Sequence, residues 1–544
     1  MSIFDLKTDV NQLSSSNEGT SNMSYHQHPP SRDVTGNNFA NGAQHFRFQC
    51  SGSKWWVPAR SYLRMRAKIT NGAGDAIDLE NDVAPNMGLM ANLFQSLEMR
   101  INDKVVSRVS DFVPQIDALE TRLTKSKSWL DSIGKSTNFW DSSYLGRQND
   151  ISNDGTRYSN DTNLTDRTSV ELGYTTPNTM TISFANENNR IEIQKNAGVD
   201  LPTGVWQAGD IVEITTGTLS SSKYEVTNVV TDTVDTTRLT VAILGMPTVA
   251  NEVFTNFRQL RGNRENLARR ANEFEMTWCP SVLSLFKVGH AMPTGKYELV
   301  LNPQTSTAYQ QRAIQSLLGN KISGTDFKFE VVDFYLYTSE LDGPRVSDLT
   351  YLLDLSQTRC QAEKIDNATF GQKNMDVSPS TVALTVAYQD VRAGEDTRLS
   401  SSIFKSYPAV IDATLSTPSS ELALNRLFIN YGGVNRPAPD ADPEFKTGTD
   451  YTVQRYTDTQ IYSGALYDTG GAETIQEYHK RGSYYYFSWP KSGDDRSTRV
   501  NVHQGFASGT DVVNLRLLLF DHSKQVARIK IQDSQITSVE LEDF

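Results

Sequence analysis

Apolar and polar residues alternate along much of the chain, which is the pattern of β-strands with one buried face. In residues 61–70 apolar side chains stand at every second position from Leu63, and arginine or lysine occupies three of the positions between them. The same period of two returns in residues 97–101. The polar pair Asn102 and Asp103 follows, and it predicts a turn into a second strand.

One segment has helical spacing instead. In residues 113–130 the apolar residues recur at intervals of three, four and seven, which predicts a single amphipathic helix. Pro114 lies near its start, where proline is tolerated, and Gly134 is expected to end it. The short sequence Gly134-Lys135-Ser136 resembles part of a phosphate-binding loop, but the first glycine of that loop is missing and a helix precedes it, which favours a plain helix end.

Residues 141–260 have a different composition, rich in Asn, Asp, Thr, Ser and Gly. Short strand-like runs, at residues 179–185, 190–194, 210–216 and 238–244, are separated by turn residues. A polar segment of this kind cannot bury enough surface to belong to a core, so we interpret it as a long insertion that lies on the exposed side of the protein.

Strand patterns resume after Arg261 and continue to about Thr338, where Gly343 and Pro344 interrupt them before a second set begins. We therefore expect an all-β protein with two successive units. The expected division is an N-terminal arm over residues 1–43, a first unit over 44–338 that contains the insertion, and a second unit over 339–544.

Composition limits the classes of function. The chain has 544 residues, 38% hydrophobic and 21% charged, and its net charge is −12. No apolar run is long enough to span a membrane, and the N-terminus lacks a secretory signal. The polar arm carries few basic residues, so we expect no strong direct binding of nucleic acid. The three cysteines are far apart, which argues against a disulfide framework or a cysteine zinc site.

Candidate chemistry is sparse. No nucleophile elbow, zinc-helix or dinucleotide-loop motif occurs, so we expect no catalytic residues, no enzymatic activity and no cofactor. The weak candidates for metal ligands have the spacing of a calcium loop, although Asn- and Asp-rich loops produce that spacing by chance; they are Asp150, Ser152, Asp154 and Asp161, around Gly155. His26 and His28 are read as solvated arm residues. The aromatic clusters at 55–56 and 484–487 are expected in the core or in subunit contacts.

Five blocks of the chain, in their order, resemble a known family. The blocks are residues 46–69 (FRFQCSGSKWWVPARSYLRMRAKI), 91–134 (ANLFQSLEMRINDKVVSRVSDFVPQIDALETRLTKSKSWLDSIG), 274–303 (FEMTWCPSVLSLFKVGHAMPTGKYELVLNP), 422–437 (LALNRLFINYGGVNRP) and 513–541 (VNLRLLLFDHSKQVARIKIQDSQITSVEL). They are similar to the double jelly-roll major capsid proteins of polinton-like viruses, virophages and adenovirus-lineage viruses.

The resemblance implies two jelly-roll β-sandwiches in tandem, with the long polar insertion in the first and a short helix after its early strands. It further implies a homotrimer that forms a pseudo-hexagonal capsomer and, with neighbouring capsomers and minor capsid (penton or cement) proteins, an icosahedral shell around a viral DNA genome. The chain would then be located in the virion after synthesis in the host cytoplasm or nucleus. The resemblance does not decide whether the virion contains an internal membrane. The apolar tip of the arm, Ile3, Phe4 and Leu6, is expected to contact a neighbouring subunit.

Two other classes fit the same composition. A β-rich carbohydrate-active enzyme or carbohydrate-binding protein would also be long, acidic and aromatic, and an enzyme of this class would use a pair of carboxylates. A trimeric viral fibre or spike protein would also be all-β, although repeated short strands are more typical of it than two large, unlike halves.

Overall fold

The structure of the chain is a computed structural model. It describes residues 23–50, 54–76, 84–86, 88–134, 136–137, 181–185, 190–194, 211–214, 222–231, 238–243, 253–254, 257–260, 273–315, 327–343, 348–365, 371–390, 424–436, 456–461, 463, 471–472, 484–488, 498–506 and 515–543. Between residues 181 and 260 the description covers the backbone of the strands only.

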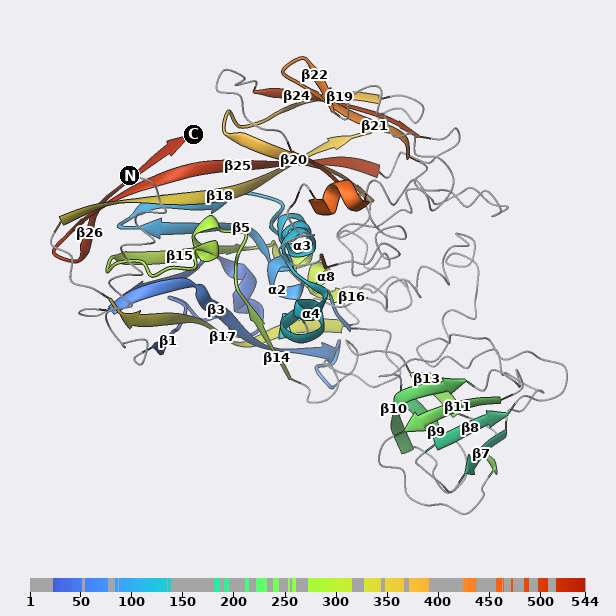
Figure 1. Cartoon of the computed structure of the whole chain (residues 1–544). Coiled ribbons are helices and arrows are strands. Elements are labelled where there is room, and N and C mark those ends of the chain that lie inside the picture. The colour runs from blue at the N-terminus through green and yellow to red at the C-terminus, as the bar shows by residue number, and fades with distance from the viewer. Residues whose placement is uncertain are drawn as a thin grey trace.

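Two four-stranded antiparallel sheets form the first sandwich (Figure 1). Sheet A has the order β1 (Ser24–His28), β17 (Phe327–Asp342), β3 (Lys54–Asn71), β14 (Phe274–Trp278). Sheet B has the order β2 (Gln44–Gln49), β15 (Lys296–Pro303), β5 (Phe94–Ile101), β6 (Lys104–Val109). The alternating side chains of β3 that the sequence pattern selected, Leu63, Met65, Ala67 and Ile69, are all fully buried between the sheets.

The second sandwich repeats the arrangement. Sheet C has the order β18 (Asp348–Lys364), β25 (Leu515–Gln532), β20 (Thr381–Asp390), β23 (Tyr484–Ser488), and β26 (Gln535–Asp543) also pairs with β25. Sheet D has the order β19 (Gly371–Asp376), β24 (Arg499–Phe506), β21 (Leu424–Tyr431), β22 (Val434–Arg436).

The strand order identifies the fold of both sandwiches. When the eight principal strands of each are counted along the chain, one sheet reads 1-8-3-6 and the other reads 2-7-4-5, in the first sandwich and again in the second. This is the order of a jelly roll, in which an eight-stranded antiparallel ribbon folds over into two facing sheets. The predicted tandem of two jelly-roll sandwiches is confirmed.

Sheet C is buried on both faces. Leu517 and Leu519 of β25 belong to the core shared with sheet D, whereas Leu518 and Phe520 belong to the core shared with the first sandwich. The run of apolar residues at 517–520 lacks alternation for this reason, because neither face of the strand contacts water. The four sheets therefore appear stacked in Figure 1, with sheet C between the first sandwich and sheet D.

The segments between the strands of the first sandwich contain short helices: α2 (Leu89–Asn92), α3 (Val113–Thr124), α4 (Lys127–Trp129), α8 (Ser306–Ala313), the 3-10 helices η2 (Asn37–Asn41) and η5 (Ser284–Lys287), and the π-helical turn η3 (Leu130–Gly134). The prediction of one continuous helix over residues 113–130 is wrong in its last third, because α3 ends at Thr124. Lys125 adopts an extended backbone after α3, and the Ser126 hydroxyl accepts a hydrogen bond from the Trp129 amide, which starts a new turn. Gly134 ends η3, as expected of a terminal glycine.

The N-terminal segment differs from the expected arm. Residues 24–28 form β1, which pairs with β17 at the edge of sheet A, and Phe39 is fully buried against Phe94 and Phe334. The sequence pattern missed β1 because its side chains are mostly polar, and it is held through backbone pairing on one side only. Residues 1–22, with Ile3, Phe4 and Leu6, lie outside the described residues.

Within residues 141–260 the described strands pair only among themselves. They are β7 (Thr181–Ala185), β8 (Arg190–Gln194), β9 (Ile211–Ile214), β10 (Ser222–Thr231), β11 (Arg238–Ile243), β12 (Val253–Phe254) and β13 (Phe257–Leu260), in the sheet order β12-β7-β8-β11-β10-β9-β13. The four strand-like runs of the sequence correspond to β7, β8, β9 and β11. A small pair, β4 (Ala84–Pro85) and β16 (Ile314–Gln315), belongs to neither sandwich sheet.

The predicted turn after β5 also joins the two sandwiches. Asn102 and Asp103 have φ angles of 49° and 64°, which suit a tight hairpin. The Asn102 amide nitrogen Nδ2 donates to the Ile536 carbonyl at 2.6 Å, and its Oδ1 accepts from the Lys296 amide at 3.0 Å. One side chain of the first sandwich thus holds the β25–β26 hairpin of the second.

We expect Asn102→Gly to lower the free energy of unfolding by about 1–2 kcal/mol, because glycine keeps the backbone angles but loses both side-chain hydrogen bonds. Asp103→Gly is the matched control, expected within about 0.5 kcal/mol of the parent. Urea unfolding of the three proteins measures the difference, and equal losses for both variants would contradict the role given to the Asn102 side chain.

Candidate functional site

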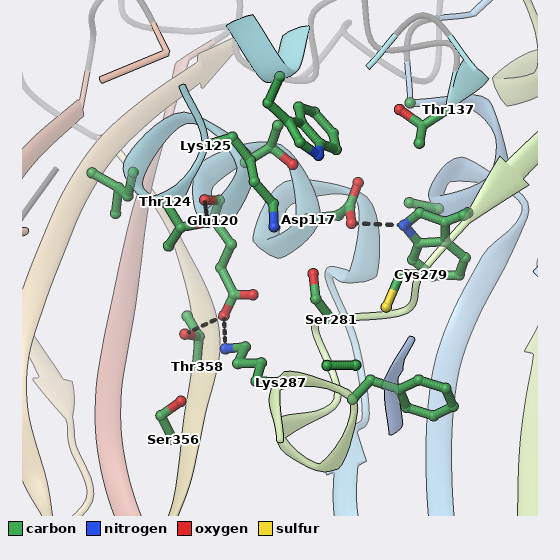
Figure 2. Close-up of a pocket in the computed structure, with 18 of the residues that line it drawn as sticks. Asp117, Glu120, Thr124, Lys125, Thr137, Cys279, Ser281, Lys287, Ser356 and Thr358 are labelled. Carbon is green, nitrogen blue, oxygen red and sulfur yellow. Dashed lines mark hydrogen bonds and ion pairs between the residues drawn. The ribbon is translucent and has the colours of Figure 1, made fainter. Parts of the chain in front are cut away.

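A cluster of polar side chains lies where the two sandwiches meet, around a pocket of about 820 Å³. Its walls come from α3 and the turns after it, from the β14–η5 segment, and from β18 and β25 of the second sandwich. Figure 2 shows Asp117, Glu120 and Lys125 facing it from the helical side, and Ser356 and Thr358 from β18. Both apolar and charged side chains line the pocket.

Helix α3 brings two carboxylates to this junction. The helix packs against α2, β5 and β18, so that every residue from Val113 to Leu123 is buried, including its polar ones. Asp117 and Glu120 are three residues apart and therefore share one face of the helix. Their side chains are directed into the pocket in Figure 2.

Glu120 links the sandwiches directly. Its Oε1 accepts from Lys287 Nζ of η5 at 2.7 Å and from the Thr358 hydroxyl of β18 at 2.8 Å. Only 6% of Glu120 is exposed, so this ion pair is shielded from water on the carboxylate side. A carboxylate that is shielded from water and accepts two hydrogen bonds holds its partners in one geometry. Leaving a buried carboxylate or one of its donors without a partner would cost free energy of folding.

The hydrogen bonds continue from Thr358 into sheet C. Because a carboxylate can only accept, Thr358 donates to Glu120, so His522 Nδ1, at 3.1 Å, donates to the Thr358 oxygen. The buried ring of His522 is neutral, so with its proton on Nδ1 the Nε2 atom accepts from the Thr385 hydroxyl at 2.8 Å. The pKa of His522 is lowered to about 3, mainly because burial disfavours the charged ring, with a smaller contribution from the positive charge of Lys287.

Asp117 is the second carboxylate of the junction, and its charge is less well balanced than that of Glu120. Its Oδ1 accepts from the indole Nε1 of Trp278 at 2.9 Å. Burial raises the pKa of Asp117 to about 7, and the nearby charge of Glu120 acts in the same direction, while the Trp278 hydrogen bond and Lys125 oppose it. The charge of Asp117 thus changes near neutral pH.

The chemistry of the junction favours a structural link. Glu120 is engaged by a lysine and a threonine, and burial raises the pKa of the neighbouring Cys279 thiol to about 12, which leaves it a poor nucleophile. Among the described residues, no group of three or more His, Cys, Asp or Glu side chains could hold a metal ion. In the same residues, no helix is long and apolar enough to cross a membrane.

The sequence candidates and the junction do not coincide. Asp150, Ser152, Asp154 and Asp161 lie outside the described residues, so the calcium loop stays a prediction. Of the aromatic clusters, Trp55, Trp56, Tyr484, Tyr485 and Phe487 are buried in the cores, as expected. Sequence reasoning missed the junction, and its one available signal was the pair of acidic residues three positions apart in the 113–130 segment.

Comparisons with known proteins concern the fold. No family model matches the chain, and no curated protein matches it. A chain in the cryo-EM structure of the Sputnik virophage is similar with a TM-score of 0.46 and 11% identity, covering 97% of this chain and 89% of that one. The mavirus major capsid protein has a TM-score of 0.39 and 11% identity, covering 95% of this chain and 90% of that one.

The faustovirus major capsid protein has a TM-score of 0.42 and 8% identity, covering 93% of this chain and 90% of that one. All three TM-scores are below 0.5, and all three sequence identities are at most 11%. The assignment of the double jelly-roll fold is therefore founded on the strand orders of sheets A to D and on no similarity score.

Proposed function

We propose that this chain is a major capsid protein, the structural subunit of an icosahedral viral shell that encloses a DNA genome. The single observation that carries the proposal is the repetition of one jelly-roll strand order in two sandwiches of the same chain. The order of sequence blocks that resembles double jelly-roll capsid proteins supports it. A structural role, in the virion and without catalysis, follows from it.

The repeated unit gives the proposal its geometry. A chain with two similar sandwiches can form a closed trimer that has six sandwiches around its axis, and such a capsomer has a nearly hexagonal outline. We propose that each sandwich is one unit. The sequence predicts these units over 44–338 and 339–544. The described strands of the first sandwich extend beyond these bounds at both ends, over residues 24–342, and those of the second lie within 348–543.

Long connections between strands indicate which end of each sandwich faces the outside of the shell. In both sandwiches a long segment joins the fifth strand to the sixth: Val109 to Phe274 in the first, and Arg436 to Tyr484 in the second. Equivalent connections leave a jelly roll at equivalent ends. We propose that these segments, including the insertion over 141–260, lie on the outer side of the shell, and that minor capsid proteins bridge adjacent capsomers.

The test is the size and outline of the purified protein. We expect light scattering to give three times the chain mass of 60.7 kDa, and negative-stain images to show a compact, six-lobed particle. A monomer that hydrolyses members of a glycan panel would contradict the proposal and favour a carbohydrate-active protein. A long, slender trimer would favour a fibre or spike.

A further inference from the structure

The outer face of sheet B carries charged side chains in two rows that cross all four strands. The backbone registers place opposite one another Arg47, Glu298, Arg100 and Val105 in one row, and His45, Val300, Glu98 and Arg108 in the next. Residues opposite one another in antiparallel strands project from the same face. The exposed Lys296 belongs to this face as well, two positions before Glu298 on β15.

The cations of this face lie above the carboxylates. Arg47 and Arg108 have 72% and 61% of their side chains exposed, whereas Glu298 and Glu98 have 10% and 14%. The cations of this face therefore outnumber its two nearly covered glutamates; they are Arg47, Arg100, Arg108 and Lys296. The exposed atoms of the face are mainly cationic, in a chain whose net charge is −12.

Ion pairs within the face orient its arginines. Glu298 accepts from Arg47 Nε at 2.6 Å, from Arg100 Nη1 at 3.2 Å and from His45 Nδ1 at 3.0 Å. Glu98 pairs with Arg100 Nε and, at 3.8 Å, with Arg108 Nε. Since Arg47 and Arg108 use Nε, their outer Nη atoms have no hydrogen bond or ion pair within the described residues. These atoms form an oriented donor pair that suits a carboxylate.

The outer face of sheet A provides a contrast within the same sandwich. There Arg64 pairs with Glu275 at 2.7 Å, Arg66 with Asp333 at 2.7 Å, and Lys68 with Glu330 at 3.1 Å. Cations and carboxylates on that face balance one another. The excess of exposed cations is thus a particular property of sheet B and does not follow from the sandwich fold.

We infer that the outer face of sheet B is a contact surface for an acidic surface of a second copy of this chain. The inference rests on the proposed function, because a shell supplies many copies at high local concentration. Each copy is acidic overall, so charge complementarity favours it as the partner. The cationic rows span only about 14 Å across four strands, which is too small for a stable pair. Such a weak contact becomes effective when a shell repeats it many times.

The test compares the double variant Arg47→Gln, Arg108→Gln with the parent in assembly from purified capsomers. We expect normal trimers, an approximately tenfold higher protein concentration at the onset of assembly, and a weaker dependence of that onset on salt, because exposed charges are screened. The matched control, Arg66→Gln with Lys68→Gln, removes two cations from sheet A and is expected to assemble like the parent.

An unchanged onset and salt dependence in the sheet B variant would overturn the inference. Loss of duplex DNA binding with an unchanged onset would overturn it too, and would assign the face to nucleic acid. Folded variant chains that no longer trimerise would support a contact between copies, located inside the capsomer. If circular dichroism shows that the double variant is unfolded, Arg108→Gln alone provides the test. Failure of the parent to form trimers is a separate result that contradicts the proposed function.

Discussion

Replacing Glu120 with alanine is expected to lower the free energy of unfolding by about 3 kcal/mol. The substitution leaves Lys287 and Thr358 without their shared carboxylate, and breaking a shielded ion pair from one side is among the most destabilising single changes. Lys287 is 29% exposed and regains some hydration, so the loss lies at the lower end of the range for buried pairs. Guanidinium unfolding, followed by tryptophan fluorescence, measures it.

The same substitution tests whether the junction couples the sandwiches. Glu120 belongs to the first sandwich and Thr358 to the second. We therefore expect the variant to unfold in two resolved steps, or in one transition whose free energy depends less steeply on denaturant concentration. Glu275→Ala is the control, since it removes an exposed ion pair with Arg64 and is expected to cost at most about 1 kcal/mol. Equal losses in the two variants would show that the junction contributes no more than a surface pair.

Replacing Asp117 with asparagine is expected to stabilise the protein at pH 8 by about 2–4 kcal/mol and to have little effect at pH 4. Asparagine keeps an oxygen that accepts from Trp278 but never ionises. The pKa of Asp117 is about 7 in the folded protein, against an ordinary value of 3.8 in the unfolded chain. As pH rises, Asp117 therefore loses its proton at a lower pH in the unfolded chain than in the folded protein. The stability of the parent therefore falls between about pH 4 and pH 7, and stays lower above pH 7.

The comparison of thermal or urea unfolding at the two pH values reports on Asp117, since titrating residues far from it act equally in parent and variant. Asp376→Asn is the matched control, because its carboxylate is 81% exposed. We expect that control to change stability by no more than about 0.5 kcal/mol at either pH. A stabilisation by Asp117→Asn that is the same at pH 4 and pH 8 would contradict a buried, protonated Asp117.

The strands of the first sandwich could be predicted from the sequence because their information is local. Leu63 to Ile69 alternate with arginine and lysine, and that alternation already specifies which face of β3 is buried. Asn102 and Asp103 predict a turn because asparagine and aspartate tolerate positive φ angles better than most residues. Where a strand lacks such a pattern, as in polar β1, sequence reasoning placed it in an arm.

The junction required the tertiary structure. Glu120 and Thr358 are 238 positions apart, and Asp117 and Trp278 are 161 apart, so no periodicity connects them. The acidic residues of α3 even weaken the helical pattern that contains them, and their burial becomes favourable only when Lys287, Thr358 and Trp278 arrive from other strands and turns.

What the sequence determined by itself was the class of structure: two β-rich units, a polar insertion, and a helix after the first hairpin. What only the tertiary structure decided was which strands are neighbours, that sheet C is covered on both faces, and which charges face each other. The physical reason is the separation along the chain of the residues that interact. Side-chain alternation depends on adjacent residues, whereas strand order and buried ion pairs depend on contacts between distant segments, whose closure a single sequence does not encode locally.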